Sequence, residues 1–138
     1  MTNERLARGY FEEAEGRLRH LDALLLEKRF ATVVRQAQEV VELLLKAALR
    51  LVGIEPARTH DVSQIIHQNA GRFPDWFRAS IEELSRISTE LAQDRGPSFY
   101  GDEVRGIPPD ELFHEADART ALERARFVFG FCQRLLEG

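Results

Sequence analysis

The chain has 138 residues, and we expect a single domain over residues 1–138. Apolar residues make up 43% and charged residues 30%, with nine Gly and five Pro, so the composition excludes a disordered chain, a collagen-like repeat and a membrane-spanning protein. The net charge of −4 argues against a protein that coats nucleic acid by bulk electrostatics.

The lone Cys132 excludes an internal disulfide and indicates a reducing compartment. The segment MTNERLARGYFEEAEG has no apolar signal, so we expect a cytoplasmic location.

Two long helices are predicted in the first part of the chain. Between Glu4 and Lys28, apolar residues recur three and four positions apart and form one narrow stripe. From Phe30 to Val52 the apolar face is wide, which is typical of a central helix with several neighbours. The opposite stripe of this helix is polar and consists of Arg35, Glu39, Glu42, Lys46 and Arg50.

Three further helices are predicted after Gly53. A short one covers Val62 to Asn69, a fourth begins near Pro74–Asp75 with an apolar face that continues to Leu91, and the last covers Glu115 to Leu136. The segment DRGPSFYGDEVRGIPPD, from Asp94 to Asp110, has three Gly, three Pro and no helical period, so we expect an irregular loop. The predicted fold is an all-α, up-and-down bundle of about five helices with a long loop before the last one.

Two phenylalanines lie away from the main apolar stripe of the last helix. Phe127 and Phe131 are one turn apart on its far side, which favours a surface for self-association. The alternative is a last helix that is buried on two sides within the monomer.

Most established kinds of catalytic site are excluded by their missing motifs. His20, His60, His67 and His114 are not paired at helical metal-ligand spacing, and one cysteine cannot form a zinc site. The cluster of His60, Asp61 and His67 fits a capping and loop role better than a metal site. No GxSxG, GxGxxG or GxxxxGK[ST] motif is present, so we expect no metal and no cofactor.

The remaining candidates are polar residues on the second helix and in the loop. Glu42 and Lys46 are four positions apart and can form an ion pair, although a solvated helix face explains the same spacing. Arg95 offers a fork of donors that suits phosphate, and Tyr100 offers a ring and a hydroxyl. We therefore take Arg95, Tyr100, Asp102, Glu42 and Lys46 as candidate nucleotide-binding residues.

The run QAQEVVELLLKAALRLVGIEPARTHDVSQII, from Gln36 to Ile66, resembles the signature of HEPN domains (higher eukaryote and prokaryote nucleotide-binding domains). The family pattern has a helix with E-x2-L-K, a glycine, a proline and then T-H-D before a short helix. Its positions here, in order, are Glu42, Leu45, Lys46, Gly53, Pro56, Thr59, His60 and Asp61. An Arg-led loop at Arg95 and the segment PPDELFHEADARTALERA extend the resemblance over nearly the whole chain.

The resemblance implies a helical bundle that is usually a homodimer, with the loop-bearing helices at the interface. Many HEPN proteins are metal-independent ribonucleases with the motif Arg-x(4–6)-His. This sequence lacks that motif, because the positions where the histidine would follow Arg95 are Tyr100, Gly101 and Asp102. None of the four histidines follows an arginine at the required distance. A tyrosine, with an unperturbed pKa of about 10, is a poor replacement for the proton-transferring imidazole.

The function predicted from the resemblance is that of a non-catalytic, nucleotide-binding partner of a minimal nucleotidyltransferase, in a two-component system of the toxin–antitoxin kind. Arg95 would hold a phosphate, Tyr100 would stack or hydrogen-bond, and the stripe with Glu42 and Lys46 would border the cleft. In some family members a tyrosine near this motif accepts nucleotidyl groups, a role that would fall to Tyr100. One alternative is a ribonuclease with a non-standard active site, which would act on RNA through Arg95 and Tyr100. Another is a plain helical module that binds a protein.

Overall fold

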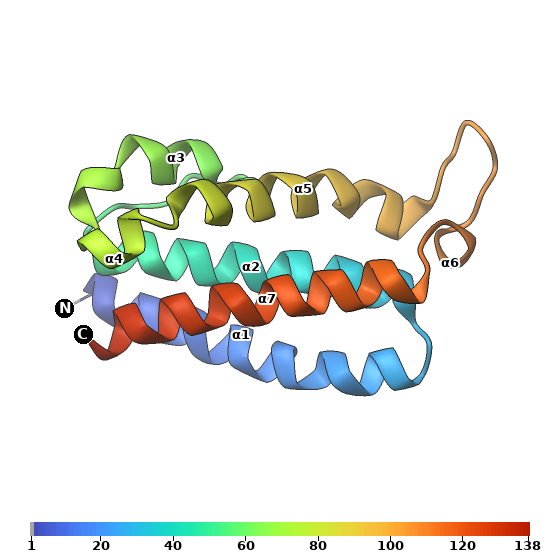
Figure 1. Cartoon of the computed structure of the whole chain (residues 1–138), viewed down its shortest axis with the longest axis horizontal. Coiled ribbons are helices and arrows are strands. Elements are labelled where there is room, and N and C mark those ends of the chain that lie inside the picture. The colour runs from blue at the N-terminus through green and yellow to red at the C-terminus, as the bar shows by residue number, and fades with distance from the viewer. Residues whose placement is uncertain (1) are drawn as a thin grey trace.

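The computed structural model describes residues 2–138, in which helices run up and down along a common direction (Figure 1). Four long helices form the bundle: α1 (Thr2–Leu26), α2 (Phe30–Leu51), α5 (Ile81–Tyr100) and α7 (Glu115–Glu137). Four short ones connect them: α3 (Ser63–Gln68), η1 (Ala70–Arg72), α4 (Asp75–Arg78) and α6 (Pro109–Leu112). The described residues contain no strand, so the predicted all-α bundle is confirmed.

The helix α2 is the centre of the fold. It packs against α1, α5 and α7, as its wide apolar face predicts. Burial of a Val or Leu side chain contributes about 1.5–3 kcal/mol, so this face is a large part of the hydrophobic core. Its buried apolar residues are Ala31, Val33, Val34, Ala37, Val40, Val41, Leu44, Leu45, Ala47, Ala48 and Leu49.

The helix predicted from Pro74 to Leu91 is divided into two helices. The chain turns at Ala79 and Ser80, between α4 and α5. The ring of Phe77 is fully buried and stacks on Phe73 with 4.4 Å between ring centroids, which fixes α4 at the end of the bundle. The break lets α5 take its own direction along α2.

The irregular loop predicted from Asp94 to Asp110 is wrong in its first part. The helix α5 continues through Gly96 and Pro97 to Tyr100, so Arg95 is helical. Pro97 cannot donate a backbone hydrogen bond and usually costs a helix about 3 kcal/mol. Here Ser98 is buried and its hydroxyl donates to the carbonyl oxygen of Arg95 at 2.7 Å, so tertiary packing and a local hydrogen bond support the last turn.

A tight turn follows α5. Gly101 has φ +73, and its missing side chain allows the carbonyl oxygen of Ile107 to approach closely. Asp102 and Ile107 pair through two backbone hydrogen bonds of 2.8 and 3.0 Å. The connection between α5 and α6 is therefore shorter and more ordered than the sequence suggested.

The two phenylalanines of α7 differ in their surroundings. Phe127 is 41% exposed, whereas Phe131 is half-buried and contacts the rings of Trp76 and Phe77. The prediction of two exposed rings therefore holds for Phe127 alone. Between Thr2 and Gly138, no helix has both the length and the apolar character needed to cross a membrane.

Candidate functional site

A row of polar side chains on α2 forms the base of the site. Gln38, Glu42 and Lys46 follow one another at intervals of four residues, so they lie on one face of the helix. Nζ of Lys46 donates to Oε2 of Glu42 at 2.8 Å, and Nε2 of Gln38 donates to Oε1 at 2.9 Å. The side chains of Glu42 and Lys46 are only 17% and 15% exposed, so this stripe is not a solvated face.

The loop before α3 brings His60 to the same carboxylate. Nδ1 of His60 lies 2.8 Å from Oε1 of Glu42. A carboxylate can only accept, so the Nδ1 atom donates and Nε2 is left for another group. The imidazole is 56% exposed, which leaves it accessible from solvent.

Asp61 anchors this loop to α5 and so positions His60. Its carboxylate accepts hydrogen bonds from the backbone of Ser63 at 3.0 Å and from the hydroxyl of Thr89 at 3.0 Å. The hydroxyl of Ser88 donates to it at 3.2 Å and accepts from the backbone of Val62 at 2.9 Å. The aspartate of the T-H-D segment is thus structural, while its histidine faces the site.

Arg95 reaches the site from α5. Its NH1 donates to Oε1 of Gln38 at 2.7 Å and lies 3.7 Å from Oε2 of Glu39. Its guanidinium carbon is 5.5 Å from the ring centroid of Phe99, and that of Arg35 is 4.3 Å from the same ring. A guanidinium has five N–H donors, and the bond to Gln38 uses one of them.

These side chains surround a small polar pocket of about 160 Å³. The pocket lies between α1, α2, α5 and the loop before α3, and its lining is Arg17, Glu39, Glu42, Leu43, His60 and Arg95. NH1 of Arg17 is 3.3 Å from Oε1 of Glu39. Two guanidinium groups, one imidazole and two carboxylates therefore meet in one concavity.

The carboxylates of Glu42 and Asp61 stay ionised because of the hydrogen bonds they accept. Burial alone would raise the pKa of Glu42, but hydrogen bonds from Lys46, Gln38 and His60 outweigh it and lower that pKa. The pKa of Asp61 is also lowered, because hydrogen bonds from Ser63, Thr89 and Ser88 outweigh its burial. Both carboxylates are charged near neutral pH, which keeps the network of donors in place.

The candidate residues from the sequence fall into two groups. Glu42, Lys46 and Arg95 are joined through Gln38 in one network. Tyr100 is 69% exposed at the end of α5, and its ring lies 5.7 Å from that of Phe99. Asp102 accepts the backbone N–H of Arg105 at 3.0 Å within the turn. Tyr100 and Asp102 are not among the residues that line the pocket.

Three residues of the site were not selected from the sequence. Gln38 is fully buried and joins Glu42 to Arg95, a role that its spacing of four from Glu42 could have indicated. His60 stood in the T-H-D motif but was assigned a loop role. Arg17 offered no signal, because its place beside the pocket depends on how α1 packs on α2.

Comparison with known proteins agrees with the helical fold. The fold is similar to the crystal structure of TT1696 from Thermus thermophilus, with a TM-score of 0.76 and 22% identity over 94% of this chain and 97% of that one. A search of the curated proteins found no match. Residues 7–135 match the HEPN domain, and this match includes every pocket residue. The chain is therefore a member of the HEPN domain family.

Proposed function

We propose that this HEPN protein binds a nucleotide in the cytoplasm, with a phosphate on Arg95, as the partner of a minimal nucleotidyltransferase in a two-component system of the toxin–antitoxin kind. The observation that carries the proposal is the fixed guanidinium of Arg95, which Gln38 holds at the wall of a pocket shared with Arg17 and His60. Arginine forks match phosphate oxygens in geometry and charge. The proposal includes a homodimer as the working form.

The size of the pocket indicates which part of the nucleotide enters it. Small-molecule sites usually measure about 300–1,000 Å³, so a pocket of about 160 Å³ suits a phosphate group better than a whole nucleotide. The base would then lie outside the pocket, where Tyr100 offers an exposed ring for stacking. Glu42 and Lys46 would border the site, and Asp102 stays a candidate contact in the adjoining turn.

Calorimetric titration with ATP tests this assignment. We expect wild type to bind and Arg95→Ala to lose at least about tenfold in affinity, because a charge-assisted contact contributes about 1.5–3 kcal/mol. Arg105→Ala is the matched control, since Arg105 is an exposed arginine outside the pocket. No ATP binding by wild type, or equal loss in both variants, would contradict the proposal.

Tyr100 is proposed as the acceptor of a nucleotidyl group from the partner enzyme. Its hydroxyl oxygen would attack the α-phosphorus of a nucleoside triphosphate, pyrophosphate would leave, and the phenolic proton would pass to solvent or to a base of that enzyme. The 69% exposure of Tyr100 supports access for a second protein. After co-expression, mass spectrometry should find one nucleotidyl group on the Tyr100 peptide and none on that of Tyr10. An unmodified Tyr100 peptide would contradict the proposed acceptor role of Tyr100.

A ribonuclease is the second candidate, and one observation favours it. Glu42 holds His60 in the pocket that Arg95 lines. His60 therefore supplies an imidazole to this pocket, although it does not belong to an Arg-x(4–6)-His motif. Nε2 of His60 could take the proton of an RNA 2′-hydroxyl as its oxygen attacks the phosphorus. The 5′-oxygen would leave with a proton from solvent and a 2′,3′-cyclic phosphate would remain. Arg95 would stabilise the negative charge on the phosphate.

RNA cleavage in the presence of EDTA distinguishes the two candidates. If the chain is a ribonuclease, His60→Ala and Arg95→Ala should each lower cleavage by at least about a hundredfold. His67→Ala is the control, because His67 does not line this pocket. Cleavage that survives Arg95→Ala would indicate a contaminating nuclease. ATP binding without cleavage would support the nucleotide-binding partner.

A further inference from the structure

Arg35 lies on the polar stripe of α2, one helical turn before Gln38 and Glu39. The helix α5 runs antiparallel to α2 and places Phe99 beside it. The guanidinium carbon of Arg35 is 4.3 Å from the ring centroid of Phe99, and that of Arg95 is 5.5 Å from the same centroid. A single ring therefore lies beside two guanidinium groups that belong to different helices.

Arg35 differs from the arginines that line the pocket, because no carboxylate of the protein balances its charge. NH1 of Arg17 is 3.3 Å from a carboxylate oxygen of Glu39, and NH1 of Arg95 is 3.7 Å from the other. Within residues 2–138, Arg35 has neither an ion pair nor a side-chain hydrogen bond, although its side chain is half-buried. Donors that are partly withdrawn from water without an acceptor cost free energy. An anionic ligand would supply the missing acceptors.

The position of Arg35 relative to the pocket indicates what this charge binds. Arg95 lines the pocket of about 160 Å³, whereas Arg35 does not. A single phosphate that fills the pocket would therefore contact Arg95 and not Arg35. A second phosphate, linked to the first, would leave the pocket along the ring of Phe99, which is 43% exposed, and would reach the guanidinium of Arg35.

We propose that Arg35 is a second phosphate-binding residue, and that the site takes a nucleoside di- or triphosphate in preference to a monophosphate. The terminal phosphate occupies the pocket on Arg95, and the preceding phosphate lies on Arg35. Tyr100 follows Phe99 at the end of α5, so the phosphates lead toward the exposed ring on which the base would stack. This inference rests on the proposed function and adds to it the number of phosphates in the ligand.

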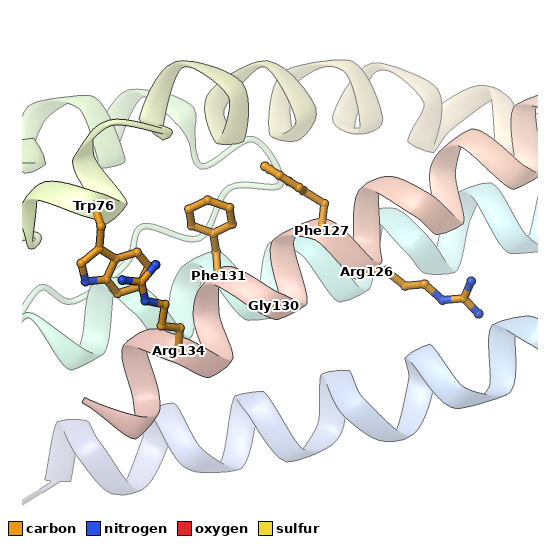
Figure 2. A pocket seen from close by; sticks show the side chains of 6 residues that line it. All are labelled: Trp76, Arg126, Phe127, Gly130, Phe131 and Arg134. Atoms are coloured by element: carbon orange, nitrogen blue, oxygen red, sulfur yellow. The ribbon is translucent and has the colours of Figure 1, made fainter.

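A groove on α7 offers another surface of aromatic rings and arginines, as Figure 2 shows. There the guanidinium carbon of Arg134 lies 4.0 Å from the ring centroid of Trp76. Arg134, like Arg35, has no ion pair within the described part of the chain, residues 2–138. The groove and the Arg95 pocket share no lining residue. Arg134 is therefore a matched control for Arg35, since both stack on one aromatic ring and lack a carboxylate partner.

Calorimetric titration of the full chain with AMP, ADP and ATP, in EDTA to remove metal ions, tests the inference. We expect wild type to bind ADP and ATP at least about tenfold more tightly than AMP, because the second phosphate adds a charge-assisted contact. Arg35→Gln should lower the affinity for ADP and ATP about tenfold and change that for AMP less than about twofold. Arg134→Gln removes the same charge and should leave all three affinities as in wild type.

A second variant separates the loss of a contact from a disturbed fold. Arg35→Lys keeps the positive charge but lacks the planar fork of donors. Its affinity for ATP should therefore lie between those of wild type and Arg35→Gln. Binding of AMP reports on the fold of each variant, because it needs the intact pocket around Arg95.

The outcomes distinguish this inference from the proposed function. If no nucleotide binds to wild type, the proposed function fails and the inference fails with it. If all three nucleotides bind through Arg95 with equal affinity, or if Arg35→Gln weakens AMP as much as ATP, only the preference for linked phosphates is overturned. A loss of ATP affinity in Arg134→Gln would place the nucleotide in the groove on α7 and would also overturn the role of Arg35.

Discussion

His60 and Glu42 are 18 positions apart in the chain, yet Nδ1 of the histidine lies 2.8 Å from Oε1 of the glutamate. The same carboxylate accepts from Lys46 through its other oxygen. Glu42 therefore joins the loop before α3 to α2 and fixes the orientation of the imidazole at the pocket. It links the stability of this part of the fold to the geometry of the site.

Replacement of Glu42 should destabilise the protein more than an exposed glutamate does. Glu42→Gln leaves the nearly buried ammonium of Lys46 without its ion pair, so we expect a loss of about 2 kcal/mol in the free energy of unfolding. Urea denaturation at neutral pH measures it. Glu4→Gln, in the exposed pair with Arg8, should cost no more than about 0.5 kcal/mol. Equal losses in the two variants would show that burial of the Glu42–Lys46 pair has no effect.

The stability should fall in acid because of Glu42 and Asp61. Both have a pKa in the folded protein below their ordinary values of 4.5 and 3.8. The unfolded chain therefore takes up their protons first, and the stabilisation present above these values is lost as the pH falls through the folded pKa values. Urea denaturation from about pH 6 to about pH 3 should show this loss.

The Glu42→Gln variant provides the control for this pH dependence. Its deficit relative to wild type should be largest near neutral pH and should shrink as Glu42 of the wild type becomes protonated. A deficit that is constant across this range would mean that the carboxylate charge is not the cause.

Two glycines with similar positive φ values should respond differently to alanine. Gly101 and Gly106 have φ +73 and +70, but a Cβ atom at Gly101 would lie 2.0 Å from the carbonyl oxygen of Ile107, whereas at Gly106 it would meet nothing within 4 Å. Gly106→Ala should cost about 1 kcal/mol from backbone strain. Gly101→Ala should cost at least about 2 kcal/mol more, since the turn must also move. Thermal denaturation of both variants gives the comparison, and similar losses would contradict the close approach.

Cys132 should be unreactive in the folded protein. It is buried against α2, its thiol lies 3.4 Å from the carbonyl oxygen of Leu44, and burial raises its pKa to about 12. A thiol reagent at pH 8 should therefore modify wild type only as fast as the protein opens. Arg105→Cys supplies an exposed thiol in the turn and should react at once. Fast labelling of Cys132 without urea would show that α7 separates readily from α2.

The sequence by itself determined the helical class and the bounds of α1, α2 and α7 to within a few residues, because apolar periodicity and the capacity to end a helix are local properties. It also offered Glu42, Lys46 and Arg95 as candidates from their residue types and spacing, and the structure joins these three side chains through Gln38. The prediction that Arg95 lies in an irregular loop was wrong, because Gly96 and Pro97 disfavour a helix locally while the buried Ser98 supports one. Only the tertiary structure brought His60 and Arg17 to the pocket. Their positions depend on contacts between segments far apart in the chain, such as the anchor of Asp61 on Thr89, and no local pattern encodes such contacts.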